Sequence, residues 1–171
     1  MAQKNFLLQD GGGMVMGING NATSAITAGD ILYASPASAS PFGTTVPNGE
    51  IYDEIEVEPV KFATALTQGR FIVGVALHDA AAGSQVSFAT EGLWFSPVID
   101  TTGYVQAGAL LRAAEGTTYP GVTNVCTTAL TLDSSTGVGA TEVNYAVQMK
   151  IGYALTSAET DGDYIIWKFS K

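Results

Sequence analysis

The stretch that decides the fold is Val73–Leu77 (VGVAL), because it recurs in the second half of the chain as Ile151–Leu155 (IGYAL). Each of these motifs is preceded by another motif that also recurs. Ala28–Ala34 (AGDILYA) precedes the first, and Ala107–Ala113 (AGALLRA), 79 residues later, precedes the second. The motifs keep their order and nearly their spacing, which predicts an internal repeat. In each copy a glycine opens a strand from a tight turn, and small residues follow where strands pack closely.

The repeat suggests how the chain builds a core. One copy alone makes a thin core, whereas two copies together can close a sandwich or barrel and cover each other's strand edges. We therefore predict an all-β fold with little helix, a sandwich or small barrel built from two related β-rich halves. The prediction places one β domain over residues 24–171, with pseudo-repeats over 24–100 and 103–171.

Short apolar runs alternate with clusters of turn residues along the whole chain, which is typical of an all-β protein. Asp161-Gly162 predicts a hairpin turn with a positive φ. The segment Val60–Gln68, with Gly69 behind it, could form two helical turns. The predicted strands are Ile31–Ala34, Ile51–Val57, Arg70–Leu77, Gln85–Thr90, Leu93–Ser96, Ala109–Ala113, Ala129–Leu132, Val143–Leu155 and Tyr164–Phe169.

Residues 1–23 combine flexible glycines with large apolar side chains. Such a segment folds poorly by itself, because glycine loosens any regular structure. It is either an extended arm that docks on another surface or a set of edge strands, and the sequence leaves both open. The apolar side chains proposed as assembly contacts are Phe6, Leu7, Leu8, Met14 and Met16.

Glu54, Glu56 and Glu58 occupy every second position, so on a strand they share one face while Ile55 and Val57 share the other. An acidic strand face resists edge-to-edge pairing when it is solvated, and it can also serve as an assembly contact. Paired carboxylates also occur in glycosidases, but nothing in the sequence predicts an apolar pocket that would raise the pKa of one of them. We include the three carboxylates among the candidate assembly contacts.

Composition excludes several classes of function. The 171 residues carry a net charge of −9, 13% charged residues, one His and one Cys. One Cys and one His cannot build a Cys/His zinc site, and seven cations cannot neutralise many phosphates of a nucleic acid. No stretch reaches 18 apolar residues, so we expect no membrane span, and no secretory signal is expected at the N-terminus. Charge this sparse suggests a surface that partners cover.

No constellation of residues predicts catalysis, a cofactor or a metal. His78 is interpreted as a turn or surface residue, because no serine elbow accompanies it. Cys126 is interpreted as a structural thiol. Glu159, Asp161 and Asp163 surround a glycine but lack the full pattern of a calcium loop, so a turn is favoured. Trp167 is expected in the core, and an exposed aromatic platform for sugar is the alternative. The chain is therefore not expected to be an enzyme.

At this point two segments resemble a known family. Ala25–Leu32 (AITAGDIL) and Val73–Phe88 (VGVALHDAAAGSQVSF), followed by Glu91-Gly92, are similar to the head-decoration, or cement, proteins of tailed bacteriophages. The resemblance covers roughly residues 24–115 and extends weakly to the C-terminus. The Pro- and Ser-rich stretch at 35–49 and the glycine-rich residues 1–23 depart from the family pattern.

The resemblance implies a virion structural protein that is made in the host cytoplasm and binds the outside of the icosahedral capsid. It implies the major capsid protein and further copies of the chain, as a homotrimer, as partners, with no nucleic acid, membrane or cofactor. The chain's negative charge, scarce cysteine and edge strands agree with this. Two alternatives stay open: a carbohydrate-binding or adhesin-like module such as a head fibre, which would expose Trp94 or Trp167, and another virion subunit such as a tail tube.

Overall fold

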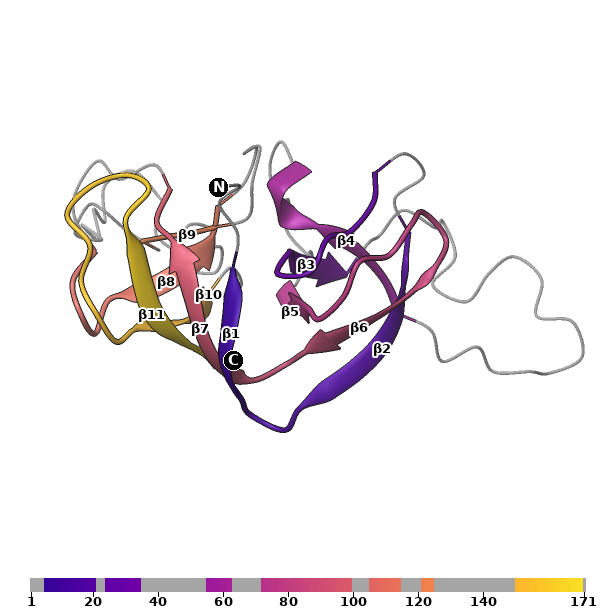
Figure 1. Cartoon of the computed structure of the whole chain (residues 1–171), viewed down its shortest axis with the longest axis horizontal. Helices are drawn as coiled ribbons and strands as arrows, with labels where there is room; N and C mark the ends of the chain where they lie inside the picture. The colour runs from indigo at the N-terminus through magenta and orange to yellow at the C-terminus, as the bar shows by residue number, and fades with distance from the viewer. Residues whose placement is uncertain are drawn as a thin grey trace, which may run out of the picture.

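A computed structural model describes residues 5–20, 24–34, 55–62, 72–99, 105–114, 121–124 and 150–170. Its regular structure is β throughout, except for a 3-10 turn at Val60–Phe62, so the predicted all-β fold is confirmed. Figure 1 shows two lobes side by side, with β2–β6 in one and β7–β11 in the other. No helix in the described part of the chain is long and apolar enough to cross a membrane.

The first lobe, residues 14–89, is a closed five-stranded barrel that we call the first unit. Its strands follow the order β2-β4-β3-β5-β6, and β6 closes the barrel by pairing with β2. β2 and β4 are parallel, and the other neighbours are antiparallel. The strands are β2 (Met14–Asn19), β3 (Ile31–Ala34), β4 (Ile55–Pro59), β5 (Ile72–Ala76) and β6 (Gln85–Ala89).

The second lobe, residues 92–169, is the second unit, and it belongs to a six-stranded sheet of order β1-β7-β11-β10-β8-β9. The first strand of that sheet, β1, comes from the N-terminus of the chain. A parallel bridge between Val98 and Val122 links β9 back towards the end of β7. The strands are β1 (Phe6–Asp10), β7 (Gly92–Pro97), β8 (Leu110–Ala113), β9 (Val122–Asn124), β10 (Lys150–Ala154) and β11 (Tyr164–Phe169).

The two units share one pattern of strand pairing. Met14 of β2 lies opposite Ala89 of β6, and 79 residues later Leu93 of β7 lies opposite Lys168 of β11. The turns agree as well, because the N–H of Gly29 donates to the carbonyl of Ala76 at 2.8 Å and the N–H of Gly108 donates to that of Ala154 at 2.8 Å. Both glycines have a positive φ, 91° and 89°.

The two segments that correspond in strand register do not begin where the predicted pseudo-repeats begin, at residues 24 and 103. The first unit starts at β2 and the second at β7, although the prediction placed β7 in the first half. The motifs could not reveal this, because β2 (MVMGIN) and β7 (GLWFSP) have no repeated motif in common. What they share is their place in the hydrogen-bond ladder, which only the folded chain displays.

Each unit has a small apolar interior. A cluster of seven buried residues fills the first barrel, and each has a buried counterpart in the second unit. A larger cluster contains residues of both units, so the units share a continuous core. The corresponding interior pairs are Ile26 and Val105, Leu32 and Leu111, Val57 and Val122, Ala76 and Ala154, Ala80 and Ala158, Val86 and Ile165, and Phe88 and Trp167.

The strand predictions agree closely where the chain is described. β3 and β11 match their predicted bounds, and β5, β6, β7 and β8 differ from theirs by one or two residues at an end. The predicted strand at 129–132 and most of the possible helix at 60–68 lie outside the described residues. Gly162 has the predicted positive φ of 87°, but β10 and β11 are joined through residues 155–163 and not by a two-residue hairpin.

Candidate assembly surface

The N-terminal segment forms one half of a long two-stranded ribbon that joins the units (Figure 1). β1 runs antiparallel to β7, and β2 runs antiparallel to β6. Between them the N–H of Thr90 donates to the carbonyl of Gly13 at 2.8 Å. At the bend, a Cβ on Gly11 would come within 2.5 Å of the Cβ of Glu91. The glycines therefore let the two strands pass closely as the ribbon turns from one unit to the other.

β1 and the start of β2 carry most of the large apolar side chains that the described chain exposes. Leu8 is 53% exposed and Met14 is 65% exposed. β1 ends the six-stranded sheet, and no described strand pairs with its outer side. A long apolar strand at a sheet edge is a template for pairing with another chain. We call this surface the apolar edge; its residues are Phe6, Leu7, Leu8, Met14, Val15 and Met16.

The start of β1 is anchored to the first unit, although β1 pairs with the second. Asn5 is buried, and its Nδ2 donates to the carbonyl of Gly29 at 2.7 Å. Farther along, the ring of Phe6 lies 6.4 Å from that of Tyr164, which in turn lies 4.7 Å from that of Phe95. These contacts hold the apolar edge in a defined position on both units.

All five assembly residues predicted on β1 and β2 are exposed: Phe6, Leu7, Leu8, Met14 and Met16. The alternative of an extended arm does not fit Met14–Asn19, because β2 is a strand of the closed barrel. β1 is an edge strand, the other predicted form. β1 and β2 pair with β7 and β6 and not with each other.

The acidic row of β4 is only partly described, because Glu54 lies outside the described residues. Glu56 and Glu58 are half-buried on the outer side of the barrel, and Val57 between them points into its core. The carboxylate of Glu58 accepts a hydrogen bond from the hydroxyl of Tyr33 at 2.8 Å. Ile55 is exposed and does not share the burial of Val57, because it begins the strand at the end of the barrel.

A buried ion pair supports the turn before β3, and the sequence reasoning missed it. Lys61 Nζ lies 2.7 Å from Asp30 Oδ1, and both side chains are buried. Asp30 Oδ2 accepts hydrogen bonds from the N–H of Thr27 at 2.8 Å and from its hydroxyl at 3.0 Å. The residue corresponding to Asp30 in the second unit is Ala109, so the same turn forms there without the pair. The pair is therefore structural, and the contrast between Asp30 and Ala109 within the repeat was the signal for it.

His78 and Asp163 also hold turns. The N–H of Ser87 donates to His78 Nε2 at 3.0 Å, and His78 Nδ1 lies 2.9 Å from the carbonyl oxygen of Asp79. Hydrogen bonds from the side chain and N–H of Thr160, and from the N–H of Glu159, lower the pKa of Asp163 below its usual 3.8. Among the residues that the structure describes, no three His, Cys, Asp or Glu side chains are grouped to hold a metal. Cys126 lies outside them.

The tryptophans are buried, which contradicts the sugar-binding alternative in the form that required an exposed Trp94 or Trp167. Trp94 and Trp167 have 1% and 0% of their surface exposed. The Nε1 of Trp167 donates to the hydroxyl of Ser96 at 2.6 Å inside the second unit. Both indoles therefore serve the core, as predicted for Trp167.

A comparison with protein families finds that the model described as "Phage cement protein" matches residues 54–169, more than half of the chain. The match begins just before β4 and ends with β11, so the apolar edge lies outside it. No curated protein matches the chain.

Proposed function

The chain belongs to the phage cement protein family, and on that premise we propose that it binds the outer surface of an icosahedral phage capsid and stabilises it by contacting the major capsid protein. The family itself implies a structural role at the virion capsid and not catalysis. The proposal includes synthesis in the host cytoplasm and assembly on the capsid as a homotrimer.

The observation that carries the proposal is the apolar edge. β1 and the start of β2 expose six of the nine large apolar side chains that the described chain leaves exposed, and concentrated apolar exposure marks interaction surfaces. Burying a fully exposed side chain of this size is worth about 1.5–3 kcal/mol, and these side chains, 36–65% exposed, have part of that amount left to gain. The row is therefore strong enough to contribute substantially to docking.

The backbone of the edge supports one specific kind of contact. An extended segment of the capsid protein can add a strand beside β1, so that main-chain hydrogen bonds supply affinity and the exposed side chains supply specificity. Leu8 marks the irregularity between the pairs Leu7–Trp94 and Gln9–Leu93, so β1 is already twisted out of a flat ladder there. The added strand must follow that irregularity, which restricts the partners that fit.

The test measures occupancy on expanded capsids assembled without this protein. Purified wild-type chain and the variant Leu8→Asn are mixed with such capsids, and bound protein is measured by co-sedimentation and by cryo-electron microscopy. We expect Leu8→Asn to bind at least about tenfold more weakly, because a difference of about 1.4 kcal/mol corresponds to that factor.

The matched control is Leu155→Asn, since Leu155 is a comparably exposed leucine (44%) that lies away from the apolar edge. It should bind as the wild type does. If the wild type never binds expanded capsids, the proposed function is wrong. If both leucine variants bind normally, the apolar edge is not the contact.

A further inference from the structure

The same sheet face is buried in the first unit and partly exposed in the second. In the first unit Val75 lies beside Ile31 on one side and Ala89 on the other, and Tyr33 lies beside Ile72. All five side chains are buried, in the cluster shared with the second unit. We call this the stacked face: Ile31, Tyr33, Ile72, Val75 and Ala89.

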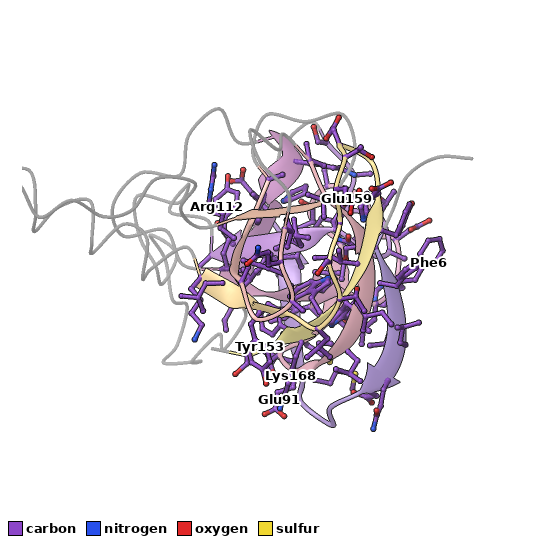
Figure 2. The ribbon with its side chains drawn as sticks, turned by 90° about the vertical axis from the view of Figure 1, so that its left-hand side faces the viewer. Phe6, Glu91, Arg112, Tyr153, Glu159 and Lys168 are labelled. Atoms are coloured by element: carbon purple, nitrogen blue, oxygen red, sulfur yellow. The ribbon has the colours of Figure 1, made fainter. Side chains whose placement is uncertain are left out.

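The corresponding face of the second unit is partly exposed. Tyr153 lies between Leu110 and Lys168, and Lys150 lies beside Arg112, in the same cross-strand arrangement as the stacked face. Leu110 is 49% exposed, Lys168 is exposed, and the other three are half-buried. Figure 2 views the molecule from this side, with Tyr153 and Lys168 close together. We call this the open face: Leu110, Arg112, Lys150, Tyr153 and Lys168.

The difference between the faces shows how the units meet. Two related units that met through the same face would bury both copies of it, whereas here only one copy is buried. The contact is therefore head to tail, and a head-to-tail contact leaves one unused surface at each end. A further unit can repeat the contact at the open face, and rings form when the rotation closes.

Charge complementarity supports a second copy of this chain as the occupant. The open face carries every Lys and Arg of residues 92–169, namely Arg112, Lys150 and Lys168. The first unit holds seven acidic and two basic residues, and one of the basic residues, Lys61, is buried against Asp30. Its charged side chains that reach the surface in the described part are Glu56, Glu58 and Asp79, all acidic. The first unit of another copy is thus complementary in charge to the open face.

We propose that the open face binds the first unit of a second copy of this chain, in a head-to-tail contact that follows the stacking of the units within the chain. The inference concerns self-association, so it names a surface for the trimer proposed above, and its test needs no capsid. Electrostatic attraction brings the copies together, and Leu110 and the ring of Tyr153 supply the apolar part of the contact.

The first experiment measures the association of the full chain by sedimentation velocity. The wild type should form oligomers that weaken when sodium chloride rises from about 0.05 M to about 0.5 M, because salt screens the attraction. The variant Lys150→Gln/Lys168→Gln should associate at least about tenfold more weakly. The matched control Ala81→Glu/Ala82→Glu changes the net charge equally at exposed residues of the first unit and should not weaken association.

A second experiment locates the partner surface. Isotope-labelled and unlabelled copies are mixed and treated with a carbodiimide, which joins lysines to nearby carboxylates. We expect links between copies from Lys150 or Lys168 to carboxylates on the first unit outside the stacked face, such as Asp79. Links between copies that avoid these two lysines overturn the proposal, as does a wild type that stays monomeric. If the lysine variant stays as associated as the wild type but loses capsid binding, the open face contacts the capsid, and only the proposed function stands.

Discussion

Asn5 and Gly29 are in close contact at the point where the N-terminal segment meets the first unit. Asn5 Nδ2 donates to the Gly29 carbonyl at 2.7 Å, and a Cβ built on Gly29 would come 2.5 Å from the Asn5 carbonyl oxygen. Gly29 also has a φ of 91°, which favours glycine. The pair joins a turn of one unit to the strand that pairs with the other.

Gly29→Ala should therefore destabilise the protein more than the same change at Gly108. Gly108 has a similar φ of 89°, but a Cβ there meets nothing within 4 Å. Gly108→Ala should lower the free energy of unfolding by about 1–2 kcal/mol, the cost of a left-handed alanine. Gly29→Ala should cost about 1–3 kcal/mol more, because Asn5 must move. Urea unfolding of both variants measures the difference, and equal losses would contradict the close packing.

Lys61→Met should cost about 3–5 kcal/mol, because it leaves the carboxylate of Asp30 buried without its cation. The double variant Asp30→Ala/Lys61→Met should lose less than Lys61→Met alone, since it copies the turn that Ala109 makes in the second unit. Thermal and urea unfolding measure both. A double variant that is less stable than Lys61→Met would show that the hydrogen bonds from Thr27 to Asp30 outweigh the ion pair.

Ser96→Ala should lower the free energy of unfolding by about 1–3 kcal/mol, because it leaves the buried Nε1 of Trp167 without its acceptor. In the first unit Phe88 and Gly17 occupy the corresponding positions and need no such bond. The double variant Ser96→Ala/Trp167→Phe removes donor and acceptor together. If Trp167→Phe costs as much stability in the Ser96→Ala variant as it does in the wild type, the two residues are independent and the hydrogen bond contributes little.

Asp163→Asn should destabilise the protein at neutral pH, with a difference that disappears in acid. Hydrogen bonds to the carboxylate lower its folded-state pKa below 3.8, so the stabilisation is present above 3.8 and is lost as the pH falls through the lowered pKa. Urea unfolding of both proteins over a pH series checks this. A difference that stays constant down to the lowest pH would mean that ionisation of Asp163 does not contribute.

The sequence by itself determined the local parts of this protein. Alternating apolar residues marked β11 at its observed bounds, and glycine after a turn residue marked the positive φ of Gly162. The motifs around Gly29 and Gly108 indicated that one turn and strand unit occurs twice. These features depend on neighbours a few residues apart, so the order of the residues suffices to predict them. The resemblance to cement proteins rests on the same segments and is confirmed by the family match.

Only the tertiary structure decided how these parts are joined and which surfaces are covered. The glycines around β1 and β2 left residues 1–23 without a strand assignment from sequence. Antiparallel partners of these strands, β7 and β6, lie more than 60 residues away. The pairing of Asp30 with Lys61, and the complete burial of Val75 where the corresponding Tyr153 is only half-buried, have the same origin. Equivalent positions in the two units occupy the same places in the strand ladder but carry different side chains. Which copy of the face is buried depends on how the units pack together, and that contact joins residues far apart in the sequence.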